Sequence, residues 1–110
     1  MLSRQQRLTR PAFAQVYKAG RRIHTKNLTG ILIPASTQKA AVVVSKKVAK
    51  KAHERNKIRR RLYALLRGEW KEKKPLSWCV FITKPSLARL TSRQFTTEIK
   101  KEIAHILNSQ

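Results

Sequence analysis

The chain has 110 residues and carries 26 lysines and arginines against 5 acidic residues, which gives a formal net charge of +21. This length suits one domain with a modest core, so we expect residues 1–110 to fold as a single unit. The charge predicts a polyanionic partner, nucleic acid before an anionic membrane surface. No apolar run approaches the ~18 residues of a membrane-spanning helix. The N-terminus has no signal-peptide core and one cysteine cannot form an internal disulfide, so we expect a cytoplasmic protein without membrane association.

The N-terminal part of the chain predicts a helix over residues 10–19. Thr9 can cap its first turn, Pro11 suits that turn, and Gly20 is a natural terminator. The apolar residues at helical spacing are Phe13, Val16 and Tyr17. The rings of Phe13 and Tyr17, at i and i+4, could stack on unpaired bases, although core packing explains Phe13 equally well.

Two apolar segments that follow have the β-branched content of strands. After a basic and extended segment over 21–26, residues 28–33 are predicted to form one strand, which Pro34 ends. Residues 35–39 are predicted to form a turn. Residues 40–45, centred on three valines, are too short for a buried helix, and we expect a strand covered on both faces.

The stretch from Val44 to Arg67 joins this strand to a densely basic helix. We expect the helix to begin near Lys51 and to end at Arg67, with Gly68 as its C-terminal cap. Its apolar stripe consists of Ile58, Leu62, Leu65 and Leu66. A helical wheel gathers a largely polar set on the opposite side: Asn56, Arg60, Tyr63 and Arg67. Because Glu54 is the one acid among ten cations here, the stretch as a whole predicts contact with nucleic acid.

Asn56 separates this helix from a generic basic face. Its amide both donates and accepts, as contact with sugar hydroxyls and base edges requires, whereas its alternative role is to cap the helix N-terminus.

The C-terminal third of the chain predicts a connector, a strand and a helix. Residues 69–75 are predicted to be a charged connector, residues 76–83 a central strand, and 84–86 the break after it. Thr91 and Gln94 match a capping box at the start of the last helix. Its apolar stripe consists of Phe95, Ile99, Ile103, Ile106 and Leu107.

Groups that could carry out chemistry are scarce, because the chain contains no aspartate. A two-metal nuclease site made of protein carboxylates is therefore not expected. Glu98 and Glu102 form an i,i+4 pair that we interpret as an exposed charged face. The three histidines show no metal-ligand spacing, and Cys79 in its apolar strand is predicted to be a buried thiol and not a nucleophile. The histidines are His24, His53 and His105.

Two motifs resemble the signature of the bacterial ribonuclease P protein family. They are Val44-Ser-Lys-Lys-Val48 and Arg55-Asn-Lys-Ile-Arg-Arg60, and the likeness extends to the first helix, the last strand and the closing helix. The resemblance implies an α+β fold: a two-layer α-β sandwich, mostly a four-stranded sheet with three helices, like a domain of ribosomal and elongation-factor proteins. It also implies that the basic helix is a left-handed β-α-β crossover, whereas sequence alone favours the right-handed connection.

The resemblance further implies that the protein is the accessory subunit of an endoribonuclease, which removes the 5′ leader from precursor tRNA with the chemistry performed by a catalytic RNA. The implied partners are that RNA and precursor tRNA, with no protein partner required. The protein alone would bind no cofactor, and the holoenzyme would need Mg²⁺. Contacts to the catalytic RNA would come from Lys46, Lys47, Lys50, Lys51, Arg55, Asn56, Lys57, Arg59 and Arg60. A cleft for the single-stranded leader would be lined by Phe13, Tyr17, Arg21 and Ser45.

This sequence departs from the family pattern at three positions. Ala49 stands where the family usually has glycine, which concerns the local turn. Leu28 and Ile31 occupy strand positions that are often aromatic, so stacking of the leader would be weaker or redistributed.

Two other functions fit parts of the pattern. A ribosomal or architectural RNA-binding protein would have the same charge and the same basic helix. An autonomous ribonuclease could use two of the three histidines as general acid and base, and it would cleave RNA without an RNA subunit.

Overall fold

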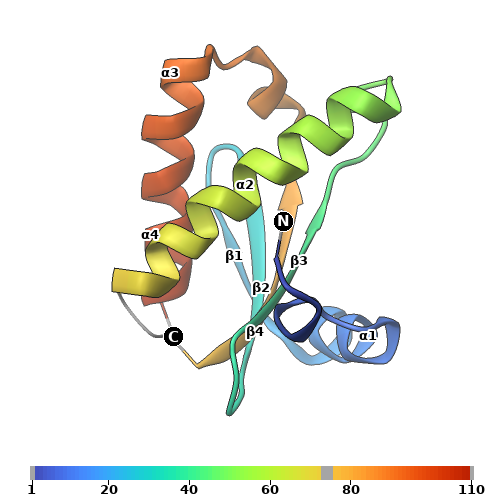
Figure 1. Ribbon diagram of the computed structural model, residues 1–110, viewed down its shortest axis with the longest axis vertical. Coiled ribbons are helices and arrows are strands. Elements are labelled where there is room, and N and C mark those ends of the chain that lie inside the picture. Colours follow the sequence, from blue (N-terminus) through green and yellow to red (C-terminus); the bar gives the residue numbers. More distant parts are fainter. Residues whose placement is uncertain (1, 73–75, 110) are drawn as a thin grey trace.

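The computed structural model describes residues 2–72 and 76–109, which form one sheet with helices on both faces (Figure 1). The strands are β1 (Arg21–His24), β2 (Leu28–Pro34), β3 (Lys39–Val43) and β4 (Ser77–Thr83). The helices are α1 (Arg10–Ala19), α2 (Ala52–Glu72), α3 (Ser92–Gln94) and α4 (Lys100–Asn108), with a π-helical turn over Phe95–Ile99 that makes α3 and α4 one continuous segment. Short 3-10 turns occupy Arg4–Gln6 and Pro85–Arg89. The α+β sandwich expected from the sequence is confirmed.

The sheet order is β1-β2-β4-β3, so β4 is central, as predicted. β2 pairs antiparallel with β1 and β4, whereas β3 and β4 run parallel and are joined through α2. In Figure 1 both of these strands run upward, α2 lies between them and the viewer, and β4 lies to the left of β3. This arrangement is a left-handed crossover, the hand that the general preference for right-handed connections disfavours.

The larger core fills the space between the sheet and the layer formed by α2 and α4. Every second residue of each strand points into it, because successive strand side chains alternate between faces. Cys79 and Phe81 of β4, for example, are almost fully buried there. The helices contribute Leu62, Leu66, Trp70, Phe95, Ile99, Ile103, Ile106 and Leu107. The predicted apolar stripe of the last helix is thus confirmed.

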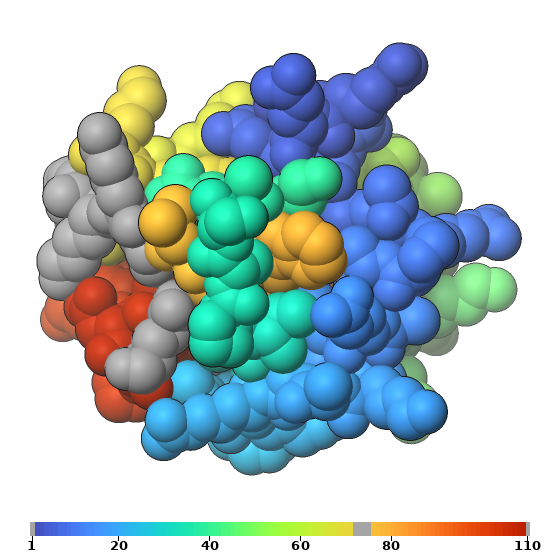
Figure 2. All heavy atoms as spheres, turned by 90° about the horizontal axis from the view of Figure 1, so that it is seen from below, coloured from blue at the N-terminus to red at the C-terminus, as the bar shows by residue number. Residues whose placement is uncertain are grey.

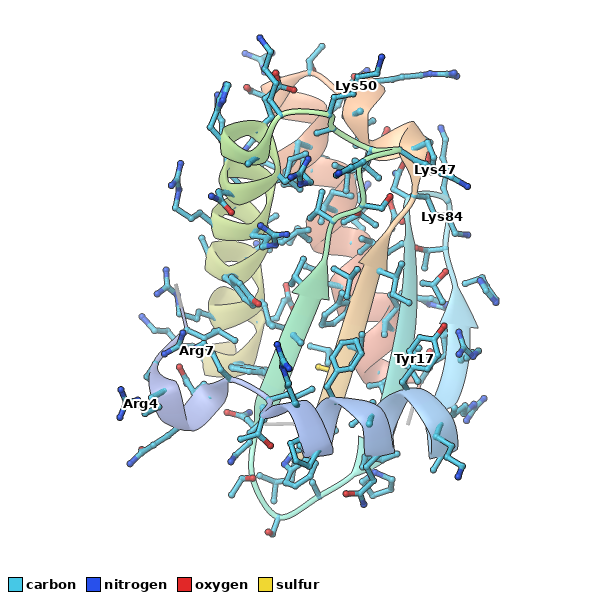
Figure 3. All side chains as sticks on the ribbon, turned by 90° about the vertical axis from the view of Figure 1, so that its right-hand side faces the viewer. Arg4, Arg7, Tyr17, Lys47, Lys50 and Lys84 are labelled. Carbon is cyan, nitrogen blue, oxygen red and sulfur yellow. The ribbon has the colours of Figure 1, made fainter. Side chains whose placement is uncertain are left out.

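The smaller core lies on the other face of the sheet, where α1 packs across the strands (Figure 3). Its fully buried members are Val16, Ile31 and Val80. Thr9 caps α1 as predicted, accepting at Oγ1 from the Ala12 amide. Gly20 ends the helix with an extended backbone. The position has no room for a side chain, because a Cβ there would lie 2.5 Å from the Val16 carbonyl oxygen.

Helix α2 begins where the sequence predicts but ends five residues later, at Glu72, so the predicted end at Arg67 and the charged connector over 69–72 are wrong. Gly68 is an interior residue of the helix, not its cap, and has no positive φ. The cost of an interior glycine is roughly 1 kcal/mol. Burial of Trp70, a side chain of roughly 150–250 Å², stabilises by up to about 4–6 kcal/mol and outweighs it. Residues 73–75, the rest of the predicted connector, lie outside the described residues.

Tyr63 is buried, so its predicted place on the polar side of α2 is also wrong. Its hydroxyl accepts a hydrogen bond of 3.1 Å from the amide of Val42 in β3. β3 itself is an edge strand in which buried and half-buried residues alternate, not a strand covered on both faces. The N-terminal segment partly covers this edge, because Arg7 bridges to Ala40 and Leu8 donates to the Ala40 carbonyl.

The last helix begins with the predicted capping box, in which the Gln94 amide donates to Thr91 Oγ1 at 3.2 Å and Thr91 N donates to Gln94 Oε1 at 3.0 Å. The interpretation of Glu102 as part of an exposed charged face is wrong. Its carboxylate accepts from the backbone and side chain of Asn27, which is fully buried at the β1–β2 turn. This contact is not visible in any local pattern, because 75 residues separate the two partners.

Candidate nucleic-acid interface

The loop between β3 and α2 holds four exposed lysines on a folded base. Val44, Val48 and Ala49 are buried beneath it, and the Ser45 carbonyl accepts from the amides of Val48 and Ala49 at 3.1 and 3.3 Å. The turn accommodates alanine at position 49, since no described residue other than glycine has a positive φ and the backbone there does not favour glycine. The exposed side chains are Lys46, Lys47, Lys50 and Lys51. Their positive charges therefore have a fixed backbone and face water.

Arg55 closes this loop against the first turn of α2. Its Nη1 donates to the carbonyl oxygens of Ala49 at 3.0 Å and of Lys50 at 2.6 Å. The side chain is half-buried. Arg55 thus positions the lysine loop, which leaves it fewer N–H groups for an external ligand.

The exposed surface of the first half of α2 has Asn56 at its centre. The Asn56 Oδ1 accepts a 2.6 Å hydrogen bond from Nη1 of Arg59, one helical turn away. Asn56 lies inside the helix, so a role as N-terminal cap does not apply. Lys57 and Arg60 are exposed beside it. The amide oxygen is therefore used within the protein, and the amide NH₂ and the exposed cations face outward.

An aromatic stack lies on the α1 side of the sheet. The rings of Phe13 and Tyr17 are 6.1 Å apart between centroids and inclined by 14°, and the Arg22 guanidinium lies 4.8 Å from the Tyr17 centroid. Tyr17 is 47% exposed, whereas Phe13 is half-buried against the smaller core. Figure 3 shows Tyr17 on this face, with Lys47 and Lys84 beyond it toward the end that carries Lys50.

The structure does not bring all four predicted leader residues together. Arg21 pairs with Leu32 on the opposite face of the sheet, where its Nη1 donates to the Ser109 carbonyl at 3.1 Å. Arg22, the next residue, faces the aromatic stack instead. Ser45 is exposed just after the end of β3 and contributes its carbonyl to the lysine loop.

Several polar groups on this side of the sheet were not predicted from the sequence. His24 Nδ1 lies 3.1 Å from Thr29 Oγ1 across the β1–β2 pair, and Lys84 Nζ donates to the Thr25 carbonyl at 2.6 Å. The alternation of strand faces would have pointed to Arg22 and His24 together, had the pairing register been known.

The candidates for chemistry stay apart. Within residues 2–72 and 76–109 no three or more histidine, cysteine or acidic side chains lie close enough to hold a metal ion. Cys79 is buried, as predicted, and desolvation by that burial raises the pKa of its thiol far above the usual range. None of the helices in the described part of the chain is long and apolar enough to cross a membrane.

Comparisons with known proteins agree with each other. A model of the family described as Ribonuclease P matches residues 2–107. The ribonuclease P protein component of Coprothermobacter proteolyticus is 32% identical over 92 residues, which are 81% of this chain and 73% of that protein. The fold is similar to that of the ribonuclease P protein from Thermotoga maritima, with a TM-score of 0.74, 20% identity and coverage of 94% and 96% of the two chains. It is also similar to that of the Staphylococcus aureus protein, with a TM-score of 0.70, 18% identity and 94% coverage of both chains.

Proposed function

The chain belongs to the ribonuclease P protein family, and on that premise we propose that it binds the catalytic RNA of the enzyme and the 5′ leader of precursor tRNA. It is the protein component of an endoribonuclease that acts in tRNA processing. In this proposal the RNA subunit and Mg²⁺ hydrolyse the phosphodiester bond that releases the leader, and the protein supplies no catalytic residue and no metal ligand. The assembly works in the cytoplasm and requires no further protein.

The exposed lysine loop with the adjoining turns of α2 carries this proposal. Buried residues beneath the loop and the Arg55 hydrogen bonds hold the backbone, so the cations are presented without a large loss of chain entropy on binding. Each phosphate that they neutralise releases a condensed counterion, which is the main source of affinity for RNA. The residues proposed for phosphate contact are Lys46, Lys47, Lys50, Lys51, Lys57 and Arg60.

The three remaining residues of the predicted RNA surface have distinct roles in this proposal. Arg55 positions the lysine loop and adds charge to it. The Arg59 guanidinium orients the Asn56 side chain, so that the NH₂ group of Asn56 can donate to a sugar hydroxyl or a base edge. Loss of Arg59 should therefore alter the contact made by Asn56 as well as remove a charge.

The 5′ leader is proposed to lie along the aromatic stack of Phe13 and Tyr17. Their rings offer a surface on which unpaired bases can stack, and such stacking tolerates any base sequence. Arg22 takes the place at this face that the sequence analysis expected for Arg21, since its guanidinium already lies over the Tyr17 ring. Ser45 would contact the strand at the junction with the lysine loop.

Reconstitution tests the function directly. Purified protein is mixed with a bacterial ribonuclease P RNA at low Mg²⁺, and cleavage of precursor tRNA is measured. We expect a large gain over RNA alone and no cleavage by protein alone. Absence of that gain would favour a ribosomal or architectural RNA-binding protein, and cleavage by protein alone would favour an autonomous ribonuclease.

A charge-matched pair of double variants tests the RNA surface. Lys57→Ala with Arg60→Ala should weaken binding to the catalytic RNA and lower the salt slope by ~0.7–0.9 for each lost phosphate contact. Lys100→Ala with Lys101→Ala removes the same charge from exposed positions on α4 and should leave the slope nearly unchanged. Equal slopes for the two variants would contradict the assignment to α2.

A further inference from the structure

A cavity of about 350 Å³ lies at the end of the molecule opposite the lysine loop. It is open to solvent and is bordered by the N-terminal 3-10 turn, the β2–β3 turn, the last turns of α2 and the residue before β4. Figure 2 shows this end, with the dark blue N-terminal segment beside the β2–β3 turn and the yellow end of α2. The lining residues are Gln6, Gln38, Arg67, Trp70, Lys71 and Leu76. The cavity is therefore separate from the surface proposed for the catalytic RNA.

Two side chains of this wall hold donors without a partner. Nε1 of Trp70 and Nε2 of Gln38 are buried, and neither has a hydrogen bond within the described part of the chain. An unpaired buried donor destabilises a fold, so such groups are rare in native structures. The second tryptophan shows the usual situation, because Nε1 of Trp78 donates to Thr37 Oγ1 at 3.0 Å. Two unpaired donors in one cavity wall point to an external acceptor.

The charges of the wall define what kind of acceptor would fit. Arg67 and Lys71 are one helical turn apart and both are exposed to the cavity side of α2, so the lining has two positive charges. Among the described residues that line the cavity, none is acidic. Indole, guanidinium and ammonium groups donate but do not accept. An oxyanion matches such a wall.

The volume and the apolar part of the wall indicate more than a bare anion. Leu76 is 55% exposed and forms one side of the cavity. The cavity volume lies within the range of roughly 300–1,000 Å³ that is usual for small-molecule sites. A phosphate group alone would leave the apolar side without contacts.

We propose that this cavity binds a nucleotide phosphate ester. The phosphate oxygens accept from Trp70 Nε1 and Gln38 Nε2 and face Arg67 and Lys71, while the sugar or base packs against Leu76. Both nitrogens are shielded from water in the unliganded fold. Binding therefore requires the flexible Gln38 side chain to turn toward the ligand and to open the approach to Trp70 Nε1. The nucleotide is either free or part of an RNA strand, since both sources present the same phosphate chemistry.

Titration of the full-length protein with adenosine 5′-monophosphate at physiological ionic strength tests this site by calorimetry. Trp70→Phe removes one donor without changing the charge and should weaken binding by roughly tenfold to a hundredfold. Trp78→Phe is the matched control, because its N–H is paired within the protein, and should bind within about twofold of the wild type. Gln38→Leu provides a second variant of unchanged charge, should Trp70→Phe fail to fold, and should also lose at least about tenfold.

Two further arms identify the ligand. Adenosine, which has no phosphate, should bind at least about tenfold more weakly than the monophosphate. A short single-stranded RNA that displaces the monophosphate from the wild type would assign the cavity to an RNA nucleotide, and failure to displace it would assign the cavity to a free nucleotide. Equal affinity of the wild type, Trp70→Phe and Gln38→Leu for the monophosphate would overturn the proposal, because binding to general surface charge is insensitive to both changes. Equal binding of adenosine would overturn it as well.

Discussion

Glu102 of α4 provides the sharpest test of the tertiary structure. Its Oε1 accepts from the Asn27 amide at 2.8 Å and from the Thr25 hydroxyl, and its Oε2 accepts from Asn27 Nδ2 at 2.6 Å. Asn27 is fully buried, and its Oδ1 accepts from Ser86 Oγ at 2.8 Å. One carboxylate therefore joins the last helix to the β1–β2 turn and to the segment after β4.

Glu102→Ala leaves two donors of a buried residue without an acceptor. Each unsatisfied donor costs about 1–3 kcal/mol, whereas the Thr25 hydroxyl keeps the Leu28 carbonyl as a partner at 3.1 Å. We expect the free energy of unfolding to fall by about 2–4 kcal/mol and Tm to fall by roughly 10 °C or more. Urea unfolding followed by circular dichroism, with an unchanged m-value, measures the loss at constant ionic strength.

Glu102→Gln separates the hydrogen bonds from the shape of the side chain. The amide keeps one acceptor oxygen but turns an NH₂ group toward a donor, so most of the loss should remain. Glu54→Gln makes the same change of charge at an exposed position in the first turn of α2 and should cost below about 1 kcal/mol. If Glu102→Gln and Glu54→Gln proved equally mild, the carboxylate would be a solvated group, and the reasoning from the buried Asn27 would be refuted.

Three further changes should be visible in the free energy of unfolding measured by urea titration. Gly68→Ala should stabilise the protein by about 0.5–1 kcal/mol, because a Cβ at this helix position has open space, and a loss of stability would instead support its predicted role as a cap. Gly30→Ala should destabilise the protein, because its Cβ would lie 2.4 Å from the Ile106 side chain. Tyr63→Phe should cost about 1–3 kcal/mol by leaving the edge-strand amide unpaired, and a neutral result would show that water replaces the hydroxyl. Burial raises the pKa of the Cys79 thiol, so this group's contribution to the free energy of unfolding is complete below the unfolded pKa of about 8.5 and should fall by about 1.4 kcal/mol per pH unit above it. Cys79→Ala should therefore make the decline of stability at alkaline pH less steep. An equally steep decline in the variant would contradict the burial of the thiol.

Local patterns were sufficient to predict much of this protein. Helix caps at Thr9 and Thr91, the apolar stripe of the last helix and the buried Cys79 depend on residues that are close in sequence or on the composition of one strand. The excess of positive charge and the motif around Arg55 and Asn56 pointed to RNA and to the family that the comparisons support. These features survive because periodicity and capping act within a few residues.

The end of α2 and the hydrogen bonds of Arg55 near its start could be identified only from the folded chain. Gly68 is a reasonable stop signal until the burial of Trp70 is known, and that burial depends on packing against distant strands. Likewise, Arg55 was expected to contact RNA, and the structure also assigns it two carbonyl oxygens of the preceding loop. At Gly68, a tertiary contact outweighs a local preference of about 1 kcal/mol.

Composition and local patterns predict RNA as the class of partner and place most helices and strands, and they establish the shortage of acidic groups. Which side chains share a face depends on how the strands pair. Arg21 and Arg22 are adjacent and equally basic, yet the pairing of β1 with β2 directs one to the Ser109 carbonyl and the other to the Tyr17 ring. Strand side chains alternate with a period of two, so a shift of one residue in register would exchange them. That register is set by contacts across the whole sheet, which no local pattern contains.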